Sequence, residues 1–407
     1  MRAVCLYLHL HQPWRYHEYS IFDVAHNSNY WYTKDHYSGQ NNERIFKKVA
    51  TKSYHPMLDL LEKCLRRFPE FKVSLSITGT WLEQAAEWDP ELIEQIDRMI
   101  STGQVEIVGE TYYHSLAFFY NKSEFVSQVR KHSDTIARLF GVRPRVFRNT
   151  ELAYNNEVGK WAAEIGYNGI LAEGWDKVLG WHSPNHVYKV AGANNCKLLL
   201  KNYRLSDDLA FRFSDKKWKE WPLTVEKYIN WLCAESTRGN LINLFMDFET
   251  FGEHQWVESG IFKFFEEFVY SWTKEVGHQF LTVSEACEFE QPMDEISMNQ
   301  TTTWADTERD LSAWCGNDMQ KEALAALYGM YDEVVGTGDG DLLDDWRRLS
   351  TSDHTYYMCT KYWNDGDVHA YFSPYASPYE AFMYFMNVLK DFEYRIKEHK
   401  KSQRIAH

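Results

Sequence analysis

The sequence lacks the excess of positive charge that nucleic-acid-binding proteins carry, because 44 Lys and Arg stand against 58 Asp and Glu and the net charge is −14. This acidic balance opposes binding to a phosphate backbone. Long hydrophobic runs are also missing: the apolar stretch from Ala3 to Leu10 is too short to span a membrane, and His9 interrupts it. We therefore expect neither nucleic acid nor a membrane as a partner.

Cysteine is sparse and scattered, with seven residues and no CxxC pair, which argues against a disulfide framework or a structural zinc site. The N-terminal stretch does not have the anatomy of a signal peptide, and together these features predict a cytoplasmic protein. The motifs GxxxxGK[ST], GxGxxG and GxSxG are absent. Nucleotide-phosphate loops and nucleophile elbows are therefore unsupported, and we expect no cofactor.

Aromatic residues are abundant, at 16% of the chain with 16 Trp and 26 Tyr. Flat amphipathic rings can hold the faces of sugars, although most of these residues are expected to pack in a large core. The tryptophans closest to the predicted strand ends and to the start of the C-terminal helices are candidates for stacking: Trp14, Trp175, Trp181, Trp256, Trp304 and Trp314.

Short apolar runs alternate with helical patterns over the first three quarters of the chain, an order typical of parallel βα units. The predicted strands are Ala3–His9, Lys72–Thr78, Gln104–Gly109, Arg145–Asn149, Gly169–Ala172, Lys197–Lys201, Leu241–Asp247 and Gln279–Val283. The predicted helices are His55–Phe68, Pro90–Thr102, Lys122–Phe140, Asn156–Gly166, Leu223–Thr237 and Glu258–Val276, and then Met319–Val335, Asp341–Lys361 and Pro378–Lys401. Seven or eight units favour an α/β barrel over residues 1–293, followed by a helical region over residues 294–407 that contributes to the active-site cleft.

Carboxylates and histidines follow several of the predicted strands. In a barrel the carboxyl ends of the strands meet at one mouth, so these groups would converge there. Glu151 and Asp247 each come directly after an apolar run, and two carboxylates are the minimum for hydrolysis of a glycosidic bond. Glu249 would point to the same side as Asp247 if the strand continues. The residues alone do not choose between Asp247 and Glu249, and either could be only a helix cap or a salt-bridge partner.

His9 and His11 share one face of an extended strand, which suits metal ligation as well as hydrogen bonds to sugar hydroxyls. Asp247 or His254 could supply a third ligand, so a metal-dependent deacetylase is the main alternative enzyme. No HxxxH helix completes a ligand set. We therefore predict no metal and place sugar binding first.

Five motifs in order resemble glycoside hydrolase family 57, the retaining α-glucan enzymes. These motifs are His9–Pro13, Gly103–Gly109, Arg148–Tyr154, Met246–His254 and Glu308–Asn317. The resemblance implies a distorted (β/α)7 barrel, similar to polysaccharide deacetylases and α-mannosidases, with a helical region behind it. By motif, Glu151 stands at the position of the nucleophile and Asp247 at that of the general acid/base.

The resemblance also implies the partners and the reaction. The substrate would be an α-glucan such as maltodextrin, glycogen or starch, cleaved by double displacement, with the two carboxyls about 5 to 5.5 Å apart. Asp247 would need a raised pKa in order to donate a proton. The resemblance is greatest to the α-amylase-type members, so we expect α-amylase activity, with 4-α-glucanotransferase as the alternative and a metal-dependent deacetylase or a non-catalytic glucan-binding protein as further alternatives. The oligomeric state stays open. The candidate substrate-binding residues are His9, His11, Trp14, Glu110, His114, Trp175, Glu249, His254, Asp310, Trp314 and Asp353.

Overall fold

The computed structural model describes residues 1–235, 238–361 and 371–406. Internal contacts divide the chain into two compact units. The first contains residues 1–11, 46–110 and 129–304, and the second contains residues 12–45 and 111–128 and the chain from 305 onward. The second unit thus takes two segments from within the range predicted for the barrel, while the predicted boundary at 293/294 and the predicted contribution to the cleft stay predictions.

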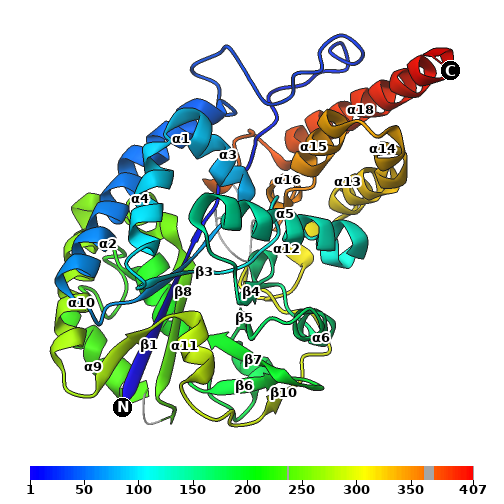
Figure 1. Cartoon of the computed structure of the whole chain (residues 1–407). Coiled ribbons are helices and arrows are strands. Elements are labelled where there is room, and N and C mark those ends of the chain that lie inside the picture. Colours follow the sequence, from blue (N-terminus) through cyan, green and yellow to red (C-terminus); the bar gives the residue numbers. More distant parts are fainter. Residues whose placement is uncertain (236–237, 362–370, 407) are drawn as a thin grey trace. The chain divides into compact units, whose positions relative to one another are not determined.

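The first unit is built on parallel strands (Figure 1). One sheet has the order β3-β2-β1-β8, with β9 also paired to β1, and the other has the order β10-β6-β7-β5-β4. β6 alone is antiparallel to its neighbour β7 among the described pairs. The strands are β1 (Arg2–Leu10), β2 (Val73–Ile77), β3 (Val105–Ile107), β4 (Val146–Arg148), β5 (Gly169–Glu173), β6 (Val187–Val190), β7 (Ala193–Lys201), β8 (Leu241–Asp247), β9 (His278–Leu281) and β10 (Glu295–Ile296).

Seven of the parallel strands form a distorted barrel. A bridge between Gly109 and Phe147 links the end of β3 to β4. Between β7 and β8 the backbone N–H of Asn202 donates to the carbonyl of Asn243 at 2.9 Å, and the Asn243 amide donates to the carbonyl of Leu200 at 2.9 Å. The predicted (β/α)7 architecture is confirmed, with β1, β2, β3, β4, β5, β7 and β8 as its strands.

The strands are apolar on both sides because the barrel interior and the surrounding helices cover both faces. On β1 the alternate residues Ala3, Cys5 and Tyr7 belong to the interior core, which includes residues of helix α11. Figure 1 shows α2, α9 and α10 on the outside of β1 and β8. The helices with residues in this unit are α1 (Asn42–Val49), α2 (His55–Arg67), α3 (Gly79–Trp88), α4 (Glu91–Ile100), α5 (Lys122–Phe140), α6 (Asn156–Glu164), α7 (Asp176–Leu179), α8 (Tyr203–Asp207), α9 (Val225–Glu235), α10 (Ile261–Lys274) and α11 (Val283–Glu288).

The second unit is helical. Its helices after residue 305 are α12 (Ser312–Cys315), α13 (Asp318–Gly329), α14 (Tyr331–Thr337), α15 (Gly340–Leu349), α16 (Ser352–Tyr356) and α18 (Pro378–Ala406). Two helices that were predicted to be continuous are each divided into two shorter helices. Asp341–Lys361 is broken at Thr351, which is extended and pairs with Ser115 while Ser352 N–H donates to the His114 carbonyl. Met319–Val335 is interrupted at Met330, between α13 and α14.

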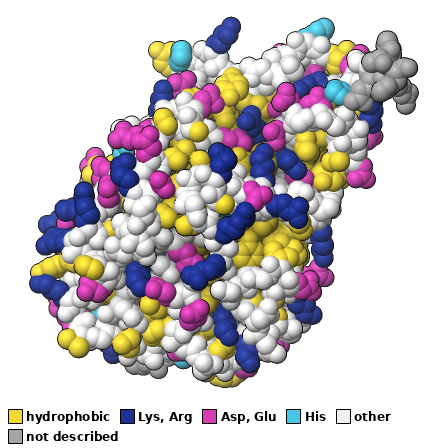
Figure 2. Space-filling model, in the orientation of Figure 1, with side chains coloured by type: hydrophobic (Ala, Val, Ile, Leu, Met, Phe, Trp, Pro, Cys, Tyr) yellow, Lys and Arg dark blue, Asp and Glu magenta, His cyan; other side chains and the backbone are white. Residues whose placement is uncertain are grey.

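The surface drawn in Figure 2 carries acidic and basic side chains interspersed with one another. The net negative charge is therefore not gathered in one patch on this face. Among the described residues, no helix combines the length and the apolar character needed to cross a membrane.

Candidate active site

A layer of ionisable side chains lies at the carboxyl ends of the barrel strands. Side chains alternate along a strand, so the residue two positions beyond an interior core residue faces the same side. Tyr7, Val146, Leu171, Leu199 and Phe245 belong to the interior core. The residues two positions further on are His9 on β1, Arg148 on β4, Glu173 on β5, Lys201 on β7 and Asp247 on β8.

His9 connects two carboxylates of this layer. Its Nε2 lies 3.1 Å from Glu110 Oε2, and its Nδ1 lies 3.5 Å from Asp247 Oδ1. Arg148 NH1 lies 3.6 Å from the same Glu110 oxygen, and the side chains of Glu110 and Arg148 are completely buried. Both ring nitrogens of His9 therefore lie near carboxylate oxygens, with which they can form hydrogen bonds or ion pairs. The expectation that the site needs no metal stays a prediction.

The protonation of Asp247 differs from the sequence-based prediction. Burial raises the pKa of the Asp247 carboxyl, but the hydrogen bond and charge of His9, with the charges of His254 and Arg148, outweigh burial and hold that pKa below its usual value. The predicted raised pKa of Asp247 was therefore wrong. The sequence does not show that His9, His254 and Arg148 lie near Asp247, because these residues meet only in the folded barrel.

The raised pKa belongs to Glu249 instead. Burial, followed by the negative charge of Asp247, raises the pKa of Glu249 to about 8, against a hydrogen bond that Tyr54 Oη donates to Glu249 Oε1 at 2.7 Å. Tyr54 ends a π-helical turn, Ala50–Tyr54, and such turns are frequent at functional sites. At neutral pH Glu249 holds a proton and Asp247 is ionised, so the pair carries one proton between them.

The loop after β8 is fixed against this turn. Gly252 has φ +111°, and a Cβ at this position would lie 1.9 Å from the carbonyl oxygen of Lys52. Only glycine fits there. His254 follows in the same loop, and burial lowers its pKa despite the neighbouring charges of Asp247 and Glu253. His254 is therefore close enough to Asp247 to interact with it electrostatically.

Glu151 lies on a short 3₁₀ turn, Thr150–Leu152, directly after β4. Its φ is +60° and that of Leu152 is +51°. Residues other than glycine rarely adopt this left-handed conformation, and where it occurs at a functional site the surrounding structure has to hold it in place. The backbone N–H and the indole N–H of Trp304 both donate to Glu151, to its carbonyl and its carboxylate respectively.

The other candidate residues of the first unit are also near strand ends. His11 Nδ1 lies 3.0 Å from Thr78 Oγ1, and the rings of His9 and His11 stack with centroids 5.8 Å apart. Trp175 precedes α7, with the ammonium of Lys177 5.0 Å from its ring centre. The first unit thus contains eight of the predicted site residues: His9, His11, Glu110, Glu151, Trp175, Asp247, Glu249 and His254.

The second unit contains the other five: Trp14, His114, Asp310, Trp314 and Asp353. Trp14 and Trp314 are each 1% exposed, and the guanidinium of Arg348 lies 4.6 Å from the ring centre of Trp14. His114 is buried with φ +52°. The role of all five in binding substrate stays a prediction.

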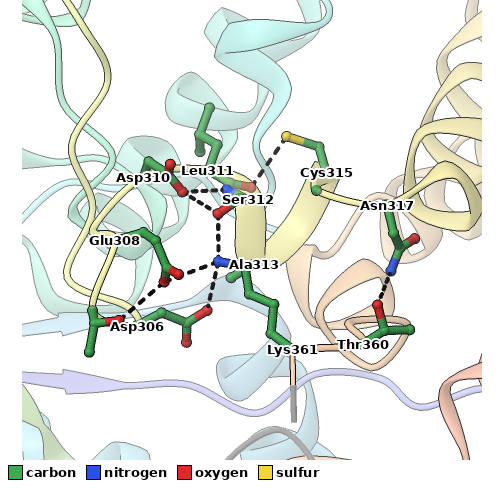
Figure 3. Close-up of polar contacts among 12 residues, drawn as sticks. Asp306, Glu308, Asp310, Leu311, Ser312, Ala313, Cys315, Asn317, Thr360 and Lys361 are labelled. Carbon is green, nitrogen blue, oxygen red and sulfur yellow. Dashed lines mark hydrogen bonds and ion pairs between the residues drawn. The ribbon is translucent and has the colours of Figure 1, made fainter. Parts of the chain in front are cut away.

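The segment with Asp310 and Trp314 is organised around one lysine (Figure 3). Lys361 Nζ lies 3.2 Å from Glu308 Oε2 and 2.6 Å from Ser312 Oγ. Asp310 accepts hydrogen bonds from the backbone N–H and the hydroxyl of Ser312 at the start of α12. This segment is therefore held in a defined conformation within the second unit.

Sequence reasoning assigned no role to Arg148, Lys201 or Tyr54, and it considered Trp304 only for stacking or packing. The signal for Arg148 and Lys201 was available, because each is the last residue of a strand and lies two positions after a buried aliphatic residue. Lys201 is 4% exposed, with Nζ 3.0 Å from Asp207 and 4.0 Å from Glu173. Tyr54 had no such signal, because helix geometry outside the barrel positions it.

A parallel barrel with convergent carboxylates at its mouth is typical of enzymes that use acid/base or nucleophilic chemistry. Comparison with known proteins identifies the enzyme family to which the chain belongs. The family model for glycosyl hydrolase family 57 matches residues 5–299. A putative α-amylase of Methanocaldococcus jannaschii is 39% identical over 400 residues, which cover 96% of this chain and 84% of that protein. The chain belongs to glycosyl hydrolase family 57, and it is a glycoside hydrolase.

Solved structures show the same fold at low identity. A 4-α-glucanotransferase from Thermococcus litoralis superposes with a TM-score of 0.67 at 17% identity, and the match covers 97% of this chain but only 60% of that one. A branching enzyme from Thermococcus kodakaraensis gives a TM-score of 0.68 at 14% identity, covering 97% of this chain and 90% of that one. The α-amylase AmyC from Thermotoga maritima gives 0.64 at 13% identity.

Proposed function

We propose that the protein is a retaining α-glucan hydrolase, an α-amylase that cleaves α-1,4-glucosidic bonds of maltodextrin or glycogen by double displacement. The observation that carries this proposal is that carboxylates stand at the ends of two strands of one barrel, Glu151 just beyond β4 and Asp247 with Glu249 at the end of β8, in a member of this family. The similarity over most of the chain to a putative α-amylase supports the substrate class.

In the proposed reaction Glu151 attacks the anomeric carbon and forms a glycosyl ester while the glycosidic oxygen leaves with a proton from Asp247. Water then attacks the ester, with Asp247 as the base. A carboxyl separation of about 5 to 5.5 Å is expected for this outcome. His9 and Glu110 orient Asp247 through the contacts described above.

The acid must be protonated when the leaving oxygen departs. Because the free enzyme holds the proton of the pair on Glu249, that proton has to reach Asp247 in the substrate complex. A neutral sugar that displaces water around Asp247 disfavours its charged form and drives this transfer. Glu249 is thus the proton store for the acid in this mechanism.

A 4-α-glucanotransferase would use the same glycosyl ester and pass it to the 4-hydroxyl of another glucan. A stretch of 129 residues is 27% identical to the 4-α-glucanotransferase of Thermococcus litoralis, but it spans 19% of that protein. This alternative differs only in the acceptor. An experiment that follows product lengths separates the two.

The deciding experiment incubates the protein with maltoheptaose, with and without chelator, and resolves products by length while counting new reducing ends. Shorter products with a matching rise in reducing ends support the α-amylase. A ladder above seven units with few new ends identifies the transferase. Loss of activity with chelator, or binding without any change in chain length, overturns the proposal.

The matched control is Glu151→Gln, which keeps the size of the side chain and removes the nucleophilic charge. We expect its rate to fall by at least about 10³-fold while maltoheptaose binding remains. Near-normal turnover in this variant would contradict the assigned nucleophile.

A further inference from the structure

The chain segment that follows β10 lies against the turn that bears Glu151. Tyr154 N–H donates to the carbonyl of Thr302 and Thr302 N–H donates to the carbonyl of Tyr154, each at 2.9 Å, so the two stretches form an antiparallel bridge. Two residues beyond the bridge, Trp304 N–H donates to the carbonyl of Glu151 at 3.2 Å. Trp304 lies outside the residues matched by the family model, which end at 299.

The side chain of Trp304 makes a second contact with the same glutamate. Its indole Nε1–H donates to Glu151 Oε2 at 2.6 Å. A glutamate with positive φ needs contacts that hold it in this conformation, and here one residue contacts both its backbone and its carboxylate. The indole therefore fixes one carboxylate oxygen.

Two buried cations hold the indole ring. The guanidinium of Arg148 lies 5.0 Å and the ammonium of Lys201 5.3 Å from its ring centre, both within the range of cation–π attraction. The ring of His9 is also near the indole, with ring centroids 6.3 Å apart. Positive charge near the π-system draws electron density from the ring, which makes the N–H a stronger donor to a carboxylate.

We propose that Trp304 is a positioning residue for the nucleophile, holding and orienting the Glu151 carboxylate through its indole N–H while Arg148 and Lys201 fix the ring. This inference rests on the proposed function, in which Glu151 attacks the anomeric carbon. The hydrogen bond favours the ionised form of Glu151, which is the form that attacks. In this arrangement the segment that leaves the barrel completes the catalytic site.

The test is Trp304→Phe, which keeps an aromatic ring and removes the donor. We expect kcat to fall by about 10-fold or more while KM changes less, because the lost contact orients the reacting group. The acidic limb of the kcat/KM pH profile should move to higher pH, since a carboxylate that loses a donor takes up a proton more readily. Trapping of the glycosyl ester with 5-fluoro-α-glucosyl fluoride should slow in parallel.

Two further variants make the result specific. Trp272→Phe removes another buried indole N–H, which donates to the Gln279 carbonyl at 3.0 Å in the core, and it should leave the pH profile unchanged. Trp304→His restores a ring donor and should recover part of the rate. If Trp304→Phe does not fold, Trp304→His decides the question by its acidic limb and trapping rate.

An unchanged acidic limb and trapping rate in Trp304→Phe would overturn the inference, as would a Trp304→His variant that recovers nothing. These outcomes are separable from failure of the proposed function. If the proposed function fails, the Glu151→Gln variant itself stays active. If Glu151→Gln is inactive and Trp304→Phe behaves as the wild type, only the role of Trp304 is rejected.

Discussion

Each unit of the molecule buries a set of charges, and the two sets differ in the lengths of some of their contacts. In the second unit Glu124 is fully buried and accepts from Arg347 at 2.8 and 3.1 Å and from Gln128 at 3.0 Å. At the barrel mouth the contacts of His9 with Asp247 and of Arg148 with Glu110 are 3.5 and 3.6 Å. The first set is held by short direct hydrogen bonds, while the second contains two neighbouring carboxyls with opposite shifts, a lowered pKa at Asp247 and a raised pKa at Glu249.

The largest effect is expected from Asp247→Asn at the barrel mouth. The variant cannot donate a proton, and we expect a loss of about 10²- to 10⁴-fold in kcat/KM on maltoheptaose. The melting temperature at neutral pH should also fall, because the lowered pKa of Asp247 means that its negative charge stabilises the folded state. Activity within tenfold of the wild type would show that another group is the acid.

At the Glu124–Arg347 pair of the second unit, substitution should affect stability strongly and activity little. Arg347→Met leaves the Glu124 carboxylate buried without its cation and should cost about 3–5 kcal/mol in the free energy of unfolding, measured by urea denaturation. The rate per folded molecule should change little. The double variant Glu124→Gln with Arg347→Met is the control and should recover much of this loss, because no unpaired charge remains. A stable Arg347→Met would mean that the pair is not the source of stability.

The strands of the barrel were predictable because their burial on both faces gives continuous apolar runs, as in β1 and β8. The break within the predicted helix Asp341–Lys361 was not predictable, because Thr351 and Ser352 make hydrogen bonds with residues distant in the sequence that compete with the helical pattern. The candidate carboxylates followed from strand ends and motifs. The position of the proton did not, because it depends on cations and a tyrosine that meet Asp247 and Glu249 only in three dimensions.

Glu249→Gln tests the movable proton through stability. The folded protein keeps a proton on Glu249 up to about pH 8, whereas the unfolded chain releases it near the usual value of 4.5. Between these values the folded state binds more protons, so its stability falls as the pH rises. The variant removes this loss.

We therefore expect equal melting temperatures for Glu249→Gln and wild type near pH 4.5 and an advantage of the variant of about 2 °C or more above pH 8. Differential scanning calorimetry across this range measures the gap. A gap that does not change with pH would contradict the raised pKa of Glu249.

The smallest effect is expected at Lys361, because its ion pairs are more exposed to water than the Glu124–Arg347 pair. It is partly exposed, and its ammonium is 3.5 Å from Asp306 and 3.2 Å from Glu308 (Figure 3). Lys361→Met should lower the free energy of unfolding by about 0.5–1 kcal/mol at low salt, because it leaves neighbouring carboxylates to repel one another. In about 1 M salt, screening should remove most of this difference. The contribution of the buried Glu124–Arg347 pair should hardly change under the same conditions, so salt dependence distinguishes the two kinds of pair.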